Sequence, residues 1–332
     1  MHSRDHTMEK IALRILFMGT PAFAVESLKA LVENGYNVVG VVTMPDKPSG
    51  RGYQLQPSAV KQYALQQGLT VLQPEKLKDE AFLHNLRQLQ ADLQIVVAFR
   101  MLPELVWSMP PKGTFNLHSS LLPQYRGAAP INWAIINGEK ETGVTTFFLS
   151  HEIDTGRIIY QEKTAIGESD NAGTMHDKLM VMGAGLVIKT VDAVLNGTVT
   201  SVPQDELHED AASLKPAPKI FKETCRIDWG KSAAELHDFI RGLSPSPAAW
   251  TELCEHGSEQ PLRVKLFTSE RISGKAETLP AGTILTDHKT LLDVVVPDGI
   301  IRITDLQLSG KKRMKTVDFL NGYTLPDDAR FC

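Results

Sequence analysis

The first two-thirds of the chain alternates short apolar runs with amphipathic stretches, and no other feature limits the possible folds as strongly. The apolar runs predict buried strands at Leu13–Met18, Val38–Thr43, Ala91–Phe99, Gly113–Leu117 and Val144–Leu149. The stretches between them predict helices at Pro21–Asn34, Pro57–Gln67 and Pro103–Met109. Strands that are apolar throughout and separated by helices are typical of a mainly parallel sheet covered on both faces. The sequence therefore predicts an α/β fold for this part of the chain.

The texture of the sequence changes after a long helical pattern at Thr174–Leu195. Residues 203–224 are rich in proline and charge and poor in large apolar side chains, which favours a linker. Beyond them, short β-like runs divided by glycine and proline predict a small β-barrel, at Leu262–Phe267, Gly282–Leu285, Leu291–Val296 and Ile300–Leu308. A chain of 332 residues is expected to form two domains, here residues 1–202 and 225–332 with the linker between them.

Three polar side chains follow predicted strands. Asn116 and His118 lie at the end of one apolar run, and Asp154 follows the run that ends at Leu149. Alternate residues of a strand share a face, so Asn116 and His118 are expected to point to the same side. Ligands of parallel sheets bind beyond the carboxyl ends of the strands. A carboxamide, an imidazole and a carboxylate in that position predict an acyl-transfer site.

Three other kinds of site are disfavoured because the sequence motifs that they require are incomplete. Gly19-Thr20-Pro21 is not a dinucleotide fingerprint, because Pro21 has no backbone N–H to offer a phosphate. Ser119 and Ser120 lack the nucleophile elbow of serine hydrolases. His151 has no second histidine at the helical spacing of a zinc site. No metal is therefore expected.

Three widely spaced cysteines, Cys225, Cys254 and Cys332, form no CxxC pair. They argue against a disulfide framework and a structural zinc site, and they suit a reducing cytoplasm. No apolar run is long enough to span a bilayer, and Met1–Lys10 lacks the apolar core of a secretory signal. We therefore expect a cytoplasmic protein that does not bind membranes, with Met1 or Met8 as its first residue.

The charge of the chain gives no global attraction for nucleic acid. It holds 35 basic and 39 acidic side chains, a net charge of −4, so any such contact must come from a local patch. One candidate patch is Lys311, Lys312 and Arg313, on a turn of the predicted barrel. The other is the loop Pro45–Tyr53, interpreted as an arm that closes on a large anionic substrate.

These residues closely resemble the methionyl-tRNA formyltransferases, which use 10-formyltetrahydrofolate. The resemblance covers nearly the whole chain and is carried by Gly19–Pro21, Pro45–Gly52, Asn116–His118, Ser120–Pro123, Arg126–Pro130, Glu141–Thr145, Asp154–Gly156, Arg226–Trp229 and Gly310–Lys312. The Asn-x-His…Asp set is shared with other 10-formyltetrahydrofolate-dependent transferases and hydrolases. The Arg126–Pro130 loop and the carboxyl-terminal domain are more particular to the tRNA enzymes.

The resemblance implies transfer of a formyl group from 10-formyltetrahydrofolate to the methionine amino group of initiator methionyl-tRNA, for translation initiation. It also implies a Rossmann-like amino-terminal catalytic domain and a carboxyl-terminal, tRNA-binding barrel resembling an OB fold. We expect the protein to be a monomer. By family position Asn116, His118 and Asp154 are catalytic, and Arg51 engages the acceptor end of the tRNA. The residues expected to line the folate site are Ser120, Leu121, Leu122 and Pro123.

The expected mechanism assigns one task to each catalytic side chain. Asn116 and His118 donate hydrogen bonds to the formyl oxygen as negative charge develops on it. His118 also relays a proton to the leaving nitrogen, N10 of the folate. Asp154 orients His118 and accepts or passes on the proton of the attacking amine.

Two departures from the family pattern bear on binding. Ala98-Phe99-Arg100-Met101 stands where the family usually has Ala-Tyr-Gly near the pterin, so Arg100 is expected to reshape part of the folate pocket. Tyr53-Gln54 replaces a frequent pair of lysines, which removes two phosphate-seeking charges. Both changes are expected to alter affinity rather than catalysis.

Three alternatives remain open from the sequence. The first is a formyltransferase acting on a small amine, against which the appended domain counts. The second is a 10-formyltetrahydrofolate hydrolase, with water as the acceptor. The third is a tRNA-binding protein with a vestigial site, which the intact Asn116, His118 and Asp154 argue against.

Overall fold

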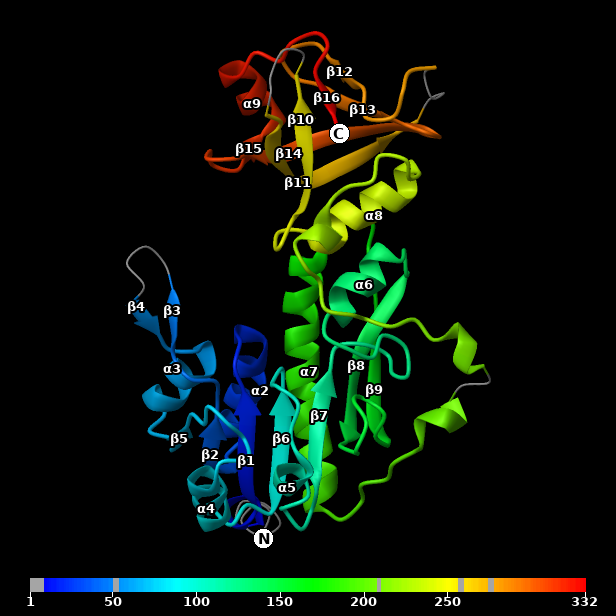
Figure 1. Ribbon diagram of the computed structural model, residues 1–332. Helices are drawn as coiled ribbons and strands as arrows, with labels where there is room; N and C mark the ends of the chain where they lie inside the picture. Colours follow the sequence, from blue (N-terminus) through cyan, green and yellow to red (C-terminus); the bar gives the residue numbers. More distant parts are fainter. Residues whose placement is uncertain (1–8, 50–53, 208–209, 256–259, 274–277) are drawn as a thin grey trace. The chain divides into compact units, whose positions relative to one another are not determined.

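The protein is represented by a computed structural model that describes residues 9–49, 54–207, 210–255, 260–273 and 278–332 (Figure 1). Its α/β sheet has seven strands in the order β5-β2-β1-β6-β7-β8-β9. They are β1 (Arg14–Gly19), β2 (Asn37–Val42), β5 (Val71–Leu72), β6 (Leu93–Val97), β7 (Thr114–His118), β8 (Glu141–Phe148) and β9 (Ile158–Ala165). The strands from β5 to β7 pair in parallel, whereas β8 runs antiparallel to β7. The predicted mainly parallel sheet is confirmed.

Helices cover both faces of this sheet. They are α2 (Ala22–Glu33), α3 (Ala59–Gln66), α4 (Glu80–Gln88), α5 (Glu104–Trp107) and α7 (Ala172–Leu195). On one face, Leu16 of β1 belongs to a buried cluster with Phe82 of α4 and Val106 of α5. On the other, α7 comes so close to β7 that a Cβ atom on Gly183 would lie 2.6 Å from Cδ2 of Leu117. Leu117 therefore faces α7.

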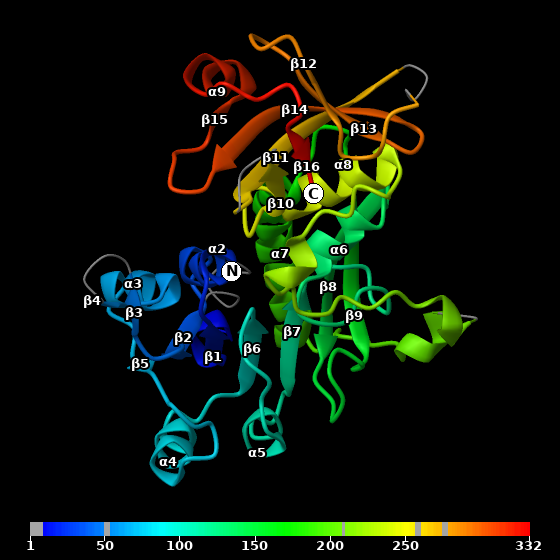
Figure 2. The same cartoon turned by 45° about the horizontal axis from the view of Figure 1, so that its top comes forward.

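A separate hairpin and a second sheet complete the strands. The hairpin pairs β3 (Lys47–Ser49) with β4 (Gln54–Gln56) and is not part of the seven-stranded sheet. The second sheet has the order β12-β13-β14-β11-β10-β16, with β15 paired to β14 (Figure 2). Its strands are β10 (Ala249–Cys254), β11 (Leu262–Ile272), β12 (Ile284–Thr286), β13 (Leu292–Val296), β14 (Gly299–Leu308), β15 (Met314–Lys315) and β16 (Arg330–Phe331).

The second sheet is antiparallel and almost closed. A bridge between Thr283 and Arg330 brings the β12 end of the order to the β16 end, so the predicted small β-barrel is confirmed. Its interior includes Leu266, Val294 and Ile303, all fully buried. The helices α6 (Pro130–Ile136), α8 (Ala233–Leu243) and α9 (Thr316–Gly322) and the 3-10 turns η1 (Gln204–Leu207), η2 (Ala211–Ser213) and η3 (Glu223–Cys225) complete the described elements.

The expectation that no disulfide forms is wrong for one pair of cysteines. Cys254 and Cys332 are joined by a disulfide, and Cys225 is free and buried. Strand β16 pairs with the end of β10, and the Cys332 amide donates to the Glu252 carbonyl over 2.8 Å. This pairing brings together two sulfur atoms that lie 78 residues apart in the sequence.

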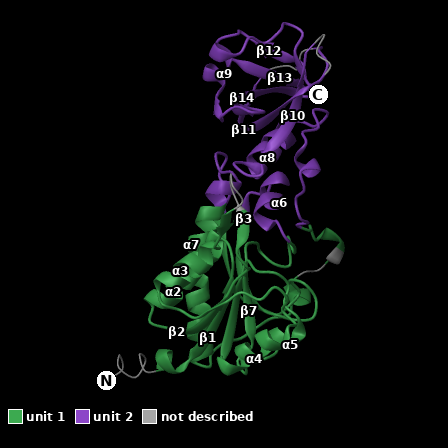
Figure 3. Ribbon diagram, turned by 60° about the vertical axis from the view of Figure 1, so that its left-hand side comes forward, with its two compact units in different colours: residues 1–127, 142–164, 176–216 green, residues 128–141, 165–175, 217–332 purple. Residues whose placement is uncertain are grey.

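The chain folds as two compact units, each made of discontinuous segments (Figure 3). The first contains residues 1–127, 142–164 and 176–216, and it includes most of the α/β sheet. The second contains residues 128–141, 165–175 and 217–332, and it includes the barrel. Part of the predicted linker, residues 203–216, belongs to the first unit.

Candidate active site

Strand β7 presents Asn116 and His118 on one face of the α/β sheet. Leu117 between them faces α7, and Thr114 on the Asn116 side donates to the Trp107 carbonyl of α5 over 2.7 Å. The two side chains therefore share the α5 face, as their spacing predicts. Among the residues that the structure describes, the half-buried side-chain amide of Asn116 has no hydrogen-bond partner. That amide is available to a ligand.

His118 is buried, with 7% of its surface exposed, and its ring is held by a main-chain group. Nε2 lies 2.9 Å from the Tyr125 carbonyl oxygen, which can only accept a hydrogen bond, so Nε2 carries a proton. The ring also packs edge-on against Phe147. The ring nitrogen left for chemistry is Nδ1.

Asp154 lies beside that nitrogen without bonding to it directly. Its Oδ2 is 3.8 Å from His118 Nδ1, which is longer than a hydrogen bond. The same oxygen accepts a 2.9 Å hydrogen bond from the Gly127 amide. The His118 ring is therefore oriented by its hydrogen bond to the Tyr125 carbonyl, and not by a bond to Asp154 as expected. One atom that carries a proton could hydrogen-bond to both His118 Nδ1 and Asp154 Oδ2.

A residue of the predicted linker fixes the loop that carries Asp154. Gln204 is 3% exposed, and its Nε2 donates to the carbonyls of Asp154 and Gly156 over 2.7 and 2.8 Å. Arg126 in turn donates to Gln204 Oε1 over 3.1 and 2.7 Å. Sequence reasoning missed Gln204, because a single glutamine in a proline-rich segment gives no signal of this role.

Gly156 permits the chain to pass very close to strand β8. A Cβ atom at this position would lie 1.6 Å from the Phe148 carbonyl oxygen, so no other residue fits without moving the backbone. This explains physically why glycine ends the Asp154-Thr155-Gly156 turn.

The segment expected to line the folate site follows β7 directly. Ser120 is fully buried and its hydroxyl donates to the Gln124 carbonyl over 2.7 Å, within the same loop. Leu122 and Pro123 are also buried, whereas Leu121 is partly exposed. Gln161 donates to the Leu122 carbonyl over 2.7 Å. The loop is thus held from inside, and Leu121 has the most exposed surface of the four.

The predicted tRNA-contacting cations differ in how far they are engaged. Arg51 lies outside the described residues. Arg313 donates to both carboxylate oxygens of the buried Asp305 over 2.8 and 2.9 Å and lies over the Phe267 ring. Lys311 and Lys312 are exposed, and within the described part of the chain their side chains have no ion-pair partner. They are the freer charges of this turn.

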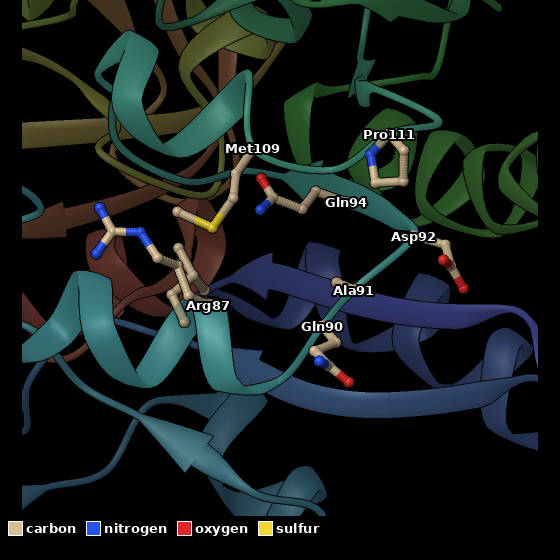
Figure 4. Close-up of a pocket in the computed structure, with 8 residues that line it drawn as sticks. Arg87, Gln90, Ala91, Asp92, Gln94, Met109 and Pro111 are labelled. Carbon is tan, nitrogen blue, oxygen red and sulfur yellow. The ribbon is translucent and has the colours of Figure 1, made fainter.

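A cavity of about 320 Å³ lies where β6 begins, and none of the predicted site residues lines it (Figure 4). Its lining includes Gln94, Asp92 and Met109. The described residues contain no cluster of three or more histidine, cysteine, aspartate or glutamate side chains that could hold a metal ion. They also contain no helix long and apolar enough to cross a membrane.

Comparisons with known proteins agree on one family. A family model described as formyl transferase matches residues 13–191, and one described as formyl transferase, C-terminal domain, matches residues 219–324. A methionyl-tRNA formyltransferase of Parabacteroides distasonis is 64% identical over 317 residues, covering 95% of this chain and 97% of that protein. One of Bacteroides thetaiotaomicron is 61% identical over 320 residues, covering 96% and 98%.

Solved structures share the fold at much lower identity. A sugar 3N-formyl transferase studied in the presence of dTDP and 5-N-formyl-THF has a TM-score of 0.62 at 18% identity, covering 90% of this chain and 99% of that chain. An N-formyltransferase of Helicobacter canadensis, in complex with folinic acid and dTDP-3-aminofucose, has a TM-score of 0.61 at 20% identity, covering 91% and 100%.

Proposed function

The chain belongs to the methionyl-tRNA formyltransferase family of formyl transferases, and we propose that it transfers a formyl group from 10-formyltetrahydrofolate to the amino group of methionine on initiator methionyl-tRNA. The observation that carries this function is identity above 60% to methionyl-tRNA formyltransferases along nearly the full length of both chains. The matches to residues 13–191 and 219–324 support a catalytic domain at 1–202 and a tRNA-binding domain at 225–332, with residues 203–224 between them, of which 203–216 belong to the first compact unit.

Asn116, His118 and Asp154 form the proposed catalytic set. The unpartnered amide of Asn116 supports a role as hydrogen-bond donor to the formyl oxygen, where negative charge develops in the transition state. The site fits a bound formyl group, because the described residues supply no hydrogen-bond partner to the Asn116 amide. Bound 10-formyltetrahydrofolate supplies the activated formyl group.

His118 and Asp154 handle the proton in this proposal. A free α-amine has a pKa of ~7.7, and the adjacent ester of methionyl-tRNA lowers the pKa of the attacking amine further, so much of it is already neutral at pH 7 and needs little activation. As the new C–N bond forms, the amine loses a proton and the leaving N10 of the folate gains one. The 3.8 Å gap between His118 Nδ1 and Asp154 Oδ2 supports passage of that proton through this pair.

The binding residues are proposed by family position together with their exposure. The loop of Ser120, Leu121, Leu122 and Pro123 lines the folate site, and the partial exposure of Leu121 supports a direct apolar contact. Lys311 and Lys312 contact tRNA phosphates, with Arg313 fixing their turn through Asp305. Arg51 engages the acceptor end. The protein acts as a monomer in the cytoplasm and does not bind membranes.

One assay tests the proposed function. Purified protein is incubated with 10-formyltetrahydrofolate and methionyl initiator tRNA, with uncharged tRNA and no tRNA as controls. We expect formyl-methionine only with the charged tRNA. Formate released without tRNA would instead identify a hydrolase, and absence of both products would contradict the proposal.

A further inference from the structure

Arg100 cross-links two loops at the carboxyl end of the α/β sheet. It follows strand β6, and its Nη1 donates to the Glu75 carbonyl over 2.7 Å while Nη2 donates to the Pro74 carbonyl. The guanidinium also lies over the Phe99 ring, 5.4 Å from its centroid. The side chain is thus committed to the loop between β5 and α4.

That loop reaches onward to the base of the β3–β4 hairpin. Gln73, next to Pro74, donates through Nε2 to the Met44 carbonyl over 3.1 Å and to Asp46 Oδ1 over 2.7 Å. Asp46 immediately precedes β3, and its Oδ2 accepts a 2.7 Å hydrogen bond from Lys61 of α3. Arg100, Gln73, Asp46 and Lys61, with the carbonyls of Pro74 and Glu75, are called the Arg100 brace below.

The hairpin depends on such contacts for its position. Within the described part of the chain, strands β3 and β4 pair only with each other, so no ladder of backbone hydrogen bonds ties these strands to the α/β sheet. The brace supplies a substitute, running from the base of the hairpin to the end of β6. Strand β6 lies beside β7, where Val96 is the partner of Asn116.

We propose that Arg100 and Gln73 are positioning residues for the acceptor tRNA, because through the brace they hold the β3–β4 hairpin in register with the catalytic strands. This inference rests on the proposed function, in which the hairpin loop engages the tRNA. It differs from the expectation that Arg100 reshapes the folate pocket. The two accounts place the effect of an Arg100 substitution on different substrates.

The test uses steady-state formylation with each substrate varied in turn, for Arg100→Ala and Gln73→Met. We expect KM for methionyl-tRNA to rise roughly tenfold in each, the size of one lost hydrogen bond to a charged group. kcat and KM for the formyl donor should stay within about twofold, since among the described residues the brace contacts none of the proposed catalytic set. Arg100→Lys, which keeps one donor, should recover part of the loss.

Arg14 offers a matched control in the same unit. It too is an arginine that donates to main-chain carbonyls, from Nε to Leu89 and Gln90 over 3.1 and 3.2 Å and from Nη2 to Leu89 over 2.9 Å. It belongs to no part of the brace, so Arg14→Ala should leave KM for tRNA unchanged. An equal rise in this variant would mean that loss of general stability explains the effect.

A double variant and a binding measurement complete the test. Because Arg100 and Gln73 act along one chain of bonds, their double variant should be little worse than either single one. Additive effects, or a rise in KM for the folate donor instead, would overturn the proposal. If the wild-type protein does not formylate tRNA, the proposed function fails, and the brace is then tested alone by the affinity of each variant for initiator tRNA.

Discussion

At the scale of single residues, the candidate active site contains two backbone conformations that L-residues seldom adopt. Tyr125 and Asp154 have φ angles of 60° and 55°. Each such residue costs on the order of 1–2 kcal/mol and persists only where its surroundings hold it. The Tyr125 amide donates to the Lys215 carbonyl over 2.7 Å, and the Asp154 carbonyl accepts from Gln204. Both supports come from residues 203–216, which therefore help to hold the candidate active site.

Replacement of Gln204 tests that dependence. Gln204→Ala removes both donors that hold the Asp154 turn, and a displacement of the carboxylate by about 1 Å can reduce kcat roughly 10- to 100-fold. Gln204→Glu should also be slow, because it keeps an acceptor for Arg126 but no donor for the turn. The measurement is kcat for formylation. An equal loss in Gln62→Ala, an exposed glutamine of α3, would contradict this role.

The sequence points to the proposed catalytic side chains more readily than to the groups that hold them in place. Asn116 and His118 follow from alternation along one strand, and in the structure they share one face of β7, with Asp154 Oδ2 3.8 Å from His118 Nδ1. Tyr125 acts through its carbonyl, which every residue possesses, so its identity gives no signal. Gln204 lies 50 residues from Asp154, and no periodic pattern connects the two.

At the scale of elements, two glycines of α7 should respond to substitution in opposite directions. Gly183 is buried against Leu117, whereas a Cβ atom on Gly185 would meet nothing within 4 Å. Gly183→Ala is expected to destabilise by about 1–3 kcal/mol through overpacking, partly offset by about 1 kcal/mol of helix propensity. Gly185→Ala should stabilise by about 0.5–1 kcal/mol. Urea unfolding of the two variants tests this, and equal shifts would contradict the close approach of α7 to β7.

Within the barrel, Asp305 should make stability depend on acidity. Burial alone would raise the pKa of Asp305, but hydrogen bonds from Arg313 and Lys315 outweigh it and hold the pKa below its usual value. A carboxyl with a lowered folded-state pKa stabilises above its unfolded pKa, and this contribution is lost as pH falls below ~4.

Asp305→Asn should therefore be less stable than wild type at pH 7. The difference in unfolding free energy between the two proteins should shrink as pH falls below ~4. Unfolding can be followed by fluorescence of Trp229 and Trp250, which are buried in this unit. Parallel pH profiles for the two proteins would show that the Asp305 charge does not stabilise the barrel.

Strong apolar runs predict elements well, and short or polar ones do not. The strands β1, β2, β6, β7 and β8 match the predicted runs to within a few residues. Strand β5 has only two residues, and β9 is an edge strand whose second half is mostly exposed, so neither shows a buried pattern. Strand β16 depends on pairing with β10, far away in the sequence.

At the scale of the whole molecule, the sequence predicts two domains but not the discontinuity of the units. The second unit gathers residues 128–141 and 165–175 with the barrel segment. One of its internal bonds runs from Asn132 to the Gly242 carbonyl over 2.8 Å, across 110 residues of sequence. Contacts of this kind depend on packing in three dimensions, which composition and periodicity do not record.

The affinity for tRNA should fall as the salt concentration rises, and Lys311 and Lys312 should account for a measurable part of that dependence. Lys311→Gln with Lys312→Gln should weaken tRNA binding and reduce the slope of log affinity against log salt by roughly 0.7–0.9 per lost phosphate contact. Arg313→Gln should lower the stability of the barrel and leave this slope nearly unchanged, because Arg313 is paired with Asp305. Filter binding across a salt series measures the slope, and an unchanged slope in the double-lysine variant would refute these contacts.

The most direct test of the catalytic set is single-turnover formylation of methionyl-tRNA by Asp154→Asn and by His118→Ala, with tRNA affinity measured in parallel. Loss of a side chain that transfers a proton in the transition state typically costs ~10²–10⁴ in rate. The proposal predicts that loss in both variants, with tRNA affinity within about twofold of wild type. A rate near that of wild type in either variant would contradict the assignment of His118 and Asp154 to the chemical step.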